Sequence, residues 1–291
     1  MGALERGASD LPGIDPRESD IDRSEITDRD LDAGSKGRWS FLLTDTAAVW
    51  TSRVSSVLLW ALIASQIDRI PGPIEVADFL IEHADLLIPN ILVTLKSAAF
   101  ALSIILVVGI LLGFAMGRWW PVRYFFTDLV MVGIALPAFI WALLAVMWWG
   151  FDDIGPIFVA CVSATPMLVV STRQGSSAVD GDLQKMSSAY RVPVTRQFRK
   201  LVLPTMSEYI IAGFRFATLA AWGAILLVEF FGSEEGIGFQ AAYWYDAGSF
   251  TGMMSWGFVM LVVIVAIDKL VMEPILRRTR RWRAEAKAWT M

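Results

Sequence analysis

The sequence is poor in the residues on which most enzyme and metal sites depend. Its 291 residues include one cysteine and one histidine. Cys161 alone cannot form an internal disulfide, and His83 alone cannot supply a histidine-rich metal site. No stretch fits the phosphate-binding pattern G-x-x-x-x-G-K-[ST], and no serine, histidine and acid set suggests a hydrolase. The sequence therefore predicts no catalytic residues, no metal and no cofactor, and it excludes nucleotide hydrolysis by this chain.

Charged residues are also scarce. They make up 19% of the chain, while 55% of the residues are hydrophobic and the mean hydropathy is +0.54. A soluble domain has about 25% charged and roughly 45–50% apolar residues, so this composition predicts a membrane protein. Beyond the first forty residues, Lys and Arg lie in short loops between apolar runs rather than on one basic face. That arrangement excludes nucleic acid as a partner.

The N-terminal segment has a different composition from the rest of the chain. Its first forty residues hold ten acids and six bases, which leaves nineteen of each in the remainder. It contains no apolar stretch typical of a secretory signal and is too acidic for a transit peptide. Segments of this kind bury too little apolar surface to fold. We predict that residues 1–45 are a disordered, acidic, cytosolic tail.

Six apolar runs follow, and we compare each with the roughly 20 residues that cross a bilayer. The first is short and contains Arg53, whose side chain must reach the headgroups. The others are long enough to span with some tilt. The predicted spans are residues 52–67, 91–116, 125–149, 155–171, 209–231 and 253–272.

The distribution of basic residues predicts the orientation of these spans. If the N-terminus is cytosolic, nearly all Lys and Arg beyond the tail fall on the inside, and the outer loops contain only Arg69. The sequence thus predicts an all-α, multi-pass plasma-membrane protein with six transmembrane helices, surrounded by the lipid bilayer, with both termini cytosolic. We expect one membrane domain over residues 46–283, followed by a cytosolic tail at 284–291.

The long inner loop at residues 172–208 is the most informative segment. Pro193 should interrupt it, because the residue before a proline is driven out of the α region. This predicts a short helix, a turn, and a second amphipathic helix that ends near Leu203 and Pro204. A basic helix lying on anionic lipid would explain the charges but not the turn. We therefore expect a compact helical projection on the cytosolic face.

With this loop in place, the chain resembles the permease subunits of ABC importers, in particular those for nitrate, taurine and alkanesulfonates. The resemblance covers about residues 70–283 and rests on short motifs in a fixed order. They are Ile70 to Val76, Thr94-Leu95, Gly109 to Gly113, Leu136-Pro137, Gly150 to Gly155, Pro166, Gly175, Gly213-Phe214-Arg215, Ala221-Trp222, Glu229, Gly236-Ile237-Gly238 and Asp268-Lys269-Leu270.

The resemblance implies a type I ABC importer permease fold in which the inner loop couples to an ATPase. The family's pattern is Glu-Ala-Ala, three residues, Gly, and Leu-Pro about twelve residues on. Lys185, Met186, Ser187 and Arg191 occupy the first four of those positions. Arginine resists the positive φ that glycine accepts, so we expect a turn reshaped around Pro193. The coupling residues implied are Lys185, Met186, Ser187, Ser188, Ala189, Tyr190, Arg191, Pro193, Leu203 and Pro204.

Charged side chains within spans are costly, at about 2.5–3.5 kcal/mol at a helix centre, so they are candidates for function. Lys96 and Asp128 lie near span ends, where snorkelling explains them equally well, and Arg215 lies deeper. Aromatic residues at helical spacing are more often packing than lining. The candidates for the translocation path are Lys96, Arg215, Trp222 and Glu229.

Two classes of function remain at this point. The first is a permease subunit of an ABC importer that passes a small polar or organic anion. Its partners would be ATP-binding cassette ATPase subunits, an external substrate-binding protein and a second permease subunit, identical or different. The departures at Lys185 and Arg191 favour a different second subunit. The alternative is a secondary transporter or channel driven by a gradient. Binding of an ATPase to the inner loop separates the two.

Overall fold

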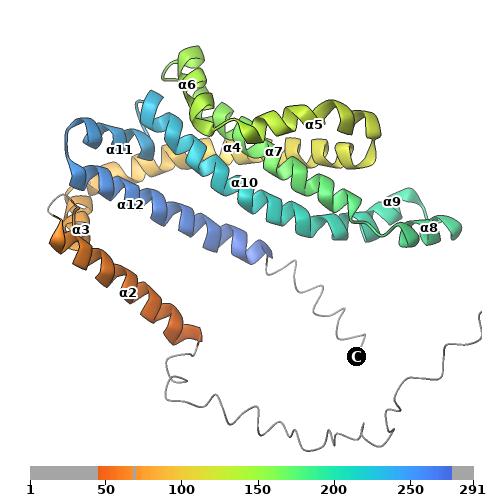
Figure 1. The fold of residues 1–291 in the computed structure, drawn as a ribbon, viewed down its shortest axis with the longest axis horizontal. Coiled ribbons are helices and arrows are strands. Elements are labelled where there is room, and N and C mark those ends of the chain that lie inside the picture. The colour runs from red at the N-terminus through yellow and green to blue at the C-terminus, as the bar shows by residue number, and fades with distance from the viewer. Residues whose placement is uncertain (1–44, 68–69, 277–291) are drawn as a thin grey trace, which may run out of the picture. The chain divides into compact units, whose positions relative to one another are not determined.

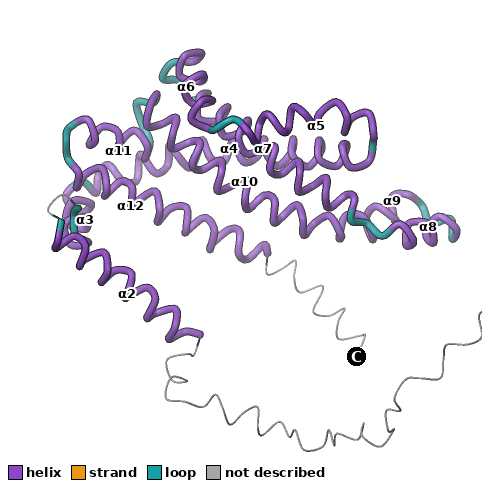
Figure 2. The backbone as a smooth tube through the Cα atoms, in the orientation of Figure 1, coloured by secondary structure: helices purple, strands orange, loops and turns teal. Residues whose placement is uncertain are grey.

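The computed structural model describes residues 45–67 and 70–276, and the described part is made of helices joined by short loops and turns (Figure 1, Figure 2). The predicted tails lie outside this part, apart from Asp45, as do Arg69 and the last basic residues. The helices are α2 (Asp45–Gln66), α3 (Pro73–Glu82), α4 (Ala84–Arg118), α5 (Trp120–Ala135), α6 (Ala138–Trp149), α7 (Ile154–Ser177), α8 (Gly181–Ala189), α9 (Val194–Gln197), α10 (Leu203–Gly232), α11 (Ile237–Asp246) and α12 (Phe250–Ile267), with π-helical turns η1 (Phe198–Val202) and η2 (Asp268–Met272).

Helix α2 falls largely in a separate compact unit that ends at Leu62, while a second unit begins at Ile63. It coincides with the first predicted span, but it does not reach the apolar content of a membrane-crossing helix. Arg53 and the four hydroxyl residues within three positions of it account for this. The helix is therefore confirmed, and its crossing of the membrane stays a prediction. The four hydroxyl residues are Thr51, Ser52, Ser55 and Ser56.

Four other predicted spans are confirmed as long apolar helices. Among the described residues, those long and apolar enough to cross a membrane are Ala84–Arg118, Ile154–Ser177, Val194–Gly232 and Phe250–Leu276. The pair α5 and α6 raises the number to five if it counts as one span. The prediction of six membrane helices thus holds for four, with two further segments that are helical but not established as spans.

The predicted span at residues 125–149 is not a single straight helix. The segment bends by 93° between α5 and α6. Leu136 precedes Pro137 and has an extended backbone, with φ −77° and ψ 124°. The proline ring excludes the α conformation at the preceding residue, and Pro137 itself provides no N–H for the helix. Length and hydropathy do not register this break, because both halves are apolar.

Helix α7 lies at the centre of the second unit, packed between α4 and α10 (Figure 1). Gly109, Gly113 and Gly117 form a stripe at four-residue spacing along α4. Side chains of α7 fill the space that their missing Cβ atoms leave, and a Cβ at Gly113 would lie 2.6 Å from that of Thr172. Small residues allow helices in a membrane to approach closely. The alanine-rich core around Ala160 and Ala164 extends this close packing.

The second helix of the inner loop does not end at Leu203 and Pro204, contrary to expectation. Residues from Val194 to Gly232 form one helical stretch. The π-helical turn η1 immediately precedes α10, and Pro204 stands in the first turn of α10. A proline inside an α-helix clashes with the carbonyl four residues earlier, and the wider π turn shifts that carbonyl. The helix therefore continues through the proline into the span.

Candidate functional site

The first candidate site is the segment of α8, its following turn and α9, which projects at one end of the second unit (Figure 1). Asp180 begins α8 as its N-cap, and its side chain accepts hydrogen bonds from the backbone N–H groups of Asp182 and Leu183. Lys185 pairs with Asp182 at 3.0 Å on the exposed side. The predicted helix, turn and helix are thus present, with local hydrogen bonds that fix the start of α8.

The turn after α8 is closed by Arg191. The backbone N–H of Val192 donates to the carbonyl of Ser187, and that of Arg191 to the carbonyl of Ser188, both at 3.0 Å. This pair of bonds is the Schellman motif, which requires a left-handed residue where Arg191 stands. Its φ is 52°, a positive value that no other non-glycine residue has in the described part of the chain. The expectation that arginine would avoid a positive φ at this position is therefore wrong, because Arg191 adopts the left-handed conformation.

Arg191→Gly should stabilise the turn. The left-handed region costs a non-glycine residue roughly 1–2 kcal/mol, part of which is offset by the greater flexibility of glycine in the unfolded chain. We expect the amide of Val192 to exchange about two- to fivefold more slowly in hydrogen–deuterium exchange. Ser188→Gly, inside α8, is the control of opposite sign and should speed exchange. Unchanged or faster exchange in Arg191→Gly would contradict the strain.

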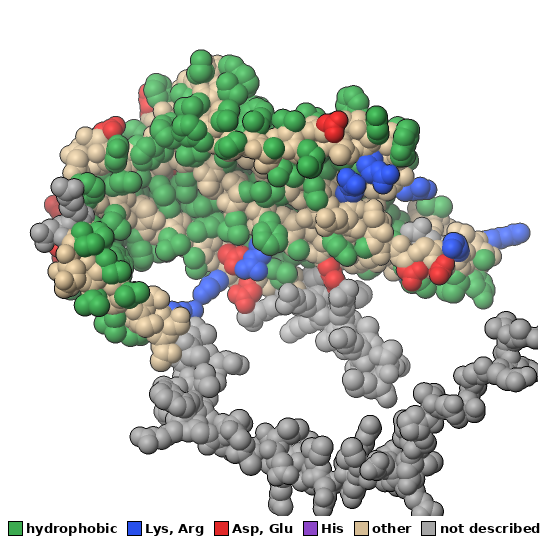
Figure 3. All heavy atoms as spheres, in the orientation of Figure 1, with side chains coloured by type: hydrophobic (Ala, Val, Ile, Leu, Met, Phe, Trp, Pro, Cys, Tyr) green, Lys and Arg blue, Asp and Glu red, His purple; other side chains and the backbone are tan. Residues whose placement is uncertain are grey.

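The α8–α9 segment exposes its side chains. Tyr190 is 76%, Val194 78% and Met186 55% exposed, and basic residues surround them. In the space-filling view, Lys and Arg side chains lie at this end together with acidic side chains, and another group of basic and acidic side chains lies along the lower edge (Figure 3). Of the ten predicted coupling residues, all are exposed except Ser187, which is half-buried; the exposed ones are Lys185, Met186, Ser188, Ala189, Tyr190, Arg191, Pro193, Leu203 and Pro204.

The second candidate site lies at the opposite end of the unit, where side chains of α4 and α10 hold the start of α11. Three consecutive backbone N–H groups donate to three side chains: Gly236 to Asn90 Oδ1, Ile237 to Thr94 Oγ1 and Gly238 to Glu229 Oε2, each at 2.9–3.0 Å. These are the donors that the first turn of a helix leaves unsatisfied. The hydroxyl of Thr94 also donates to Glu229 Oε2 at 2.9 Å, so one buried network joins three helices.

Two glycines make this approach possible. Gly236 has φ 108°, which side chains rarely allow, and a Cβ there would lie 2.6 Å from the Glu229 carboxyl carbon. A Cβ at Gly238 would lie 2.4 Å from the carbonyl oxygen of Leu226. Thr94 therefore meets two motifs that lie far from it in the sequence, at Glu229, 135 positions later, and at Gly236 to Gly238.

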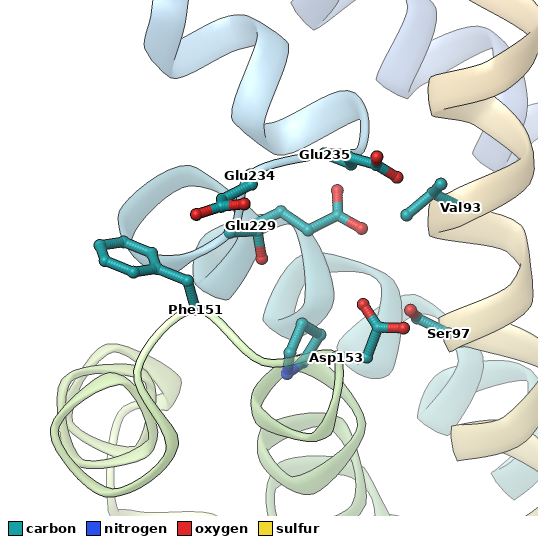
Figure 4. Close-up of a pocket in the computed structure, with 9 residues that line it drawn as sticks. Val93, Ser97, Phe151, Asp153, Glu229, Glu234 and Glu235 are labelled. Carbon is teal, nitrogen blue, oxygen red and sulfur yellow. The ribbon is translucent and has the colours of Figure 1, made fainter.

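A cavity of about 260 Å³ opens beside this network. Figure 4 shows Asp153, Glu229, Glu234 and Glu235 grouped around it, from the loop before α7, from α10 and from the loop before α11. Glu229 is 2% exposed, and its Oε1 is buried without a hydrogen-bond partner in the described structure. The remaining lining residues are Val93, Ser97, Phe151, Pro156 and Ser233.

The other predicted path residues take different places. Lys96 lies near the cavity and pairs with Asp153 at 3.4 Å, with both side chains largely exposed. Arg215 donates two hydrogen bonds, of 2.7 and 2.6 Å, to the carboxylate of Asp268 in η2. Trp222 is 6% exposed and packs in the core. Only Glu229 of the four lines the described cavity.

Sequence reasoning missed several polar residues, among them Asn90, Asp153, Glu234 and Glu235 at the second site, and Asp268 as the partner of Arg215. Each is a common polar residue near a predicted helix end or loop. Asp268 had a signal, because an arginine within a span needs a counter-charge and Asp268 is the acid in the last predicted span. The others become visible only when α4, α7 and α10 come together.

Comparison with known proteins is consistent with the resemblance seen in the sequence. Residues 105–281 match the model of a family described as "Binding-protein-dependent transport system inner membrane component". The nitrate import permease of Synechococcus elongatus is 24% identical over 230 residues, 73% of this chain and 82% of that protein. The taurine transport system permease of Escherichia coli is 21% identical over 264 residues, 87% and 95% of the two chains.

Two further similarities cover less of the chain. A putative aliphatic sulfonates transport permease of Bacillus subtilis is 25% identical over 142 residues, which is 48% of this chain and half of that protein's length. Among solved structures, an amino acid ABC transporter matches with a TM-score of 0.56 at 15% identity, covering 68% of this chain and 96% of that chain. This structural match shows a shared fold.

Proposed function

The chain belongs to the family of binding-protein-dependent transport system inner membrane components and is therefore a membrane-embedded permease component of such an importer, and from this premise we propose that α8 and α9 couple it to a separate ATPase. The energy for import then comes from nucleotide hydrolysis in the partner. This chain contributes the membrane passage and the surface on which the partner acts.

The observation that carries the proposal is the exposed apolar cluster of Met186, Tyr190 and Val194 at the tip of the projecting segment. Neighbouring exposed aromatic and aliphatic side chains with a polar rim mark protein interaction sites. The turn between the two helices has a specified backbone, closed by Arg191. A segment so shaped is suited to a groove in a partner rather than to a flat lipid surface.

The charge of the α8–α9 segment indicates the charge of the partner surface. Lys185 stands where the resembling permeases have an acid, and Arg191 and Arg196 are exposed beside it. Lys185 is partly neutralised by Asp182, whereas no ion pair is recorded for Arg191 or Arg196 in the described structure. The ATPase groove that receives this segment should therefore be acidic. A second, different permease with the family's usual motif is the proposed neighbour, so that the two permeases engage the ATPases unequally.

The remaining topology follows from the same proposal. We place the α8–α9 end and both termini in the cytosol. We also count α2 as a membrane span, which gives six spans if α5 and α6 together form one. The α11 end then faces outward, where the external binding protein delivers its solute, and the acids around the cavity lie on that side. Nitrate, taurine and sulfonates, the solutes named for the relatives, suggest a small polar solute or anion. Glu229 is the path residue retained from the sequence.

Replacement of Tyr190 by alanine tests the coupling surface. We expect Tyr190→Ala to weaken retention of the ATPase at least tenfold, because a buried interface tyrosine contributes about 2 kcal/mol or more to binding. Tyr124→Ala is the matched control, since Tyr124 is also 76% exposed but lies on α5. The measurement is purification of the tagged chain from its native membrane in mild detergent, with partner stoichiometry by mass spectrometry.

Four outcomes of this experiment are informative. An ATPase lost in Tyr190→Ala and kept in Tyr124→Ala supports the proposal, and one copy of this chain beside a second permease supports the unequal pair. Two copies and no second permease would refute that pair. Recovery of the chain without any ATPase would instead favour a gradient-driven transporter or channel.

A further inference from the structure

The cavity beside the α11 network has an unusual lining for a chain related to anion permeases. Four of its nine lining residues carry carboxyl groups, namely Asp153, Glu229, Glu234 and Glu235, and none carries a basic group. The nearby cation Lys96 forms an ion pair with Asp153. Glu234 and Glu235, which are exposed at the mouth, form no ion pair with another described residue. A free anion such as nitrate is repelled from a cavity of this charge.

Glu229 adds an observation that does not depend on the surface acids. Glu229 is 2% exposed, and its Oε2 accepts hydrogen bonds from the Thr94 hydroxyl and the Gly238 N–H. The other oxygen, Oε1, has no partner in the described structure although it is buried. Buried polar atoms are nearly always hydrogen-bonded. This oxygen on a cavity wall is a free acceptor for a donor that enters the cavity (Figure 4).

The spacing of the acids distinguishes between kinds of cation. No group of three or more acids, histidines or cysteines in the described residues is arranged to hold a metal ion. A calcium or magnesium ion needs several oxygens within about 2.6 Å. The 260 Å³ cavity instead suits a larger, organic cation. Val93 and Pro156 provide apolar contacts for its carbon atoms, and the Phe151 ring can contact a positive nitrogen through its face.

We propose that this cavity binds the ammonium group of a small organic solute, with Glu229 Oε1 and the Ser97 and Ser233 hydroxyls as acceptors and Glu234, Glu235 and Asp153 as the surrounding charge. The proposal rests on the importer function, because it assigns the class of solute. It admits zwitterions, in which an acidic group accompanies the ammonium, and it excludes bare inorganic anions.

The test is equilibrium binding of labelled ethanolamine to the full chain in nanodiscs of phosphatidylglycerol, a lipid without an ammonium group. We expect saturable binding that unlabelled ethanolamine displaces and nitrate does not. The double variant Glu234→Gln, Glu235→Gln should weaken binding at least tenfold, since it removes two of the negative charges that surround the ammonium group. Both residues are exposed, so their replacement leaves the fold intact. Glu82→Gln, at an exposed position of α3, is the matched control and should change the affinity less than twofold.

One further measurement completes the test. Binding of ethanolamine should weaken as ionic strength rises, because the mouth acids are solvent-exposed. The proposal is overturned if ethanolamine does not bind at millimolar concentration, if nitrate binds with the same dependence on the glutamates, or if the double variant binds as the control does. This binding assay contains no ATPase and is independent of the purification experiment with Tyr190→Ala. If the chain retains its ATPase in the purification but does not bind ethanolamine here, only the ammonium site is refuted.

Discussion

Gly113→Leu should prevent recovery of the folded chain, because the stripe at Gly109, Gly113 and Gly117 is where α4 contacts α7. A Cβ at Gly113 would lie 2.6 Å from the Thr172 Cβ and 2.7 Å from the carbonyl oxygen of Val169. The backbone oxygen cannot move away without displacing α7, which is the centre of the unit. Overpacking of a tight interface costs about 3 kcal/mol or more when the backbone must shift, and a leucine adds three further carbons.

Gly223→Leu is the matched control for this prediction. Gly223 is in the membrane helix α10, and a Cβ there meets nothing within 4 Å. Size-exclusion profiles and thermal unfolding in detergent give the readout. Gly113→Leu should elute mainly as aggregate, Gly113→Ala should unfold at a lower temperature than the parent chain, and Gly223→Leu should behave as the parent. Equal effects at positions 113 and 223 would show that leucine itself, and not the α4–α7 contact, is harmful.

The sequence predicted those parts of the fold that depend on local properties. Long apolar runs identified α4, α7, α10 and α12, because the length and hydropathy of a helix are properties of one segment. The helix and turn around Pro193 were predicted for the same reason. Hydropathy could not show the 93° bend at Pro137, since the residues on both sides are equally apolar.

The sites were predicted less completely, because they depend on contacts between distant segments. Thr94, Glu229 and Gly238 were recognised as separate motifs, but no spacing rule says that residues 135 positions apart share a hydrogen bond. Arg215 was identified as a costly charge, and its pairing with Asp268 required the packing of α10 against the last helix. For Arg191 the local rule about positive φ gave the wrong turn, because the Schellman hydrogen bonds outweigh the preference of the side chain.

Thr94→Val should destabilise the chain by roughly 2–4 kcal/mol, although valine has nearly the same shape. The Thr94 hydroxyl accepts from the N–H of Ile237 and donates to Glu229 Oε2. Its removal leaves a buried N–H without an acceptor and takes one donor from a buried carboxyl group. Each buried polar group left unsatisfied costs about 1–3 kcal/mol. Thr94→Ser keeps the hydroxyl and should recover most of the loss.

Thr218→Val provides the comparison that isolates the bridging role. Thr218 is also a buried threonine on a membrane helix, at 3% exposure against 0% for Thr94. Its hydroxyl donates to the carbonyl of Phe214 in its own helix, an oxygen that already serves the helix backbone. Its replacement should change the free energy of unfolding by less than about 1 kcal/mol. Both variants are measured by denaturant unfolding in detergent and, separately, by hydrogen–deuterium exchange of the α11 amides. If the two threonines had equal effects, the contact among α4, α10 and α11 would not be what holds the α11 end of the unit together.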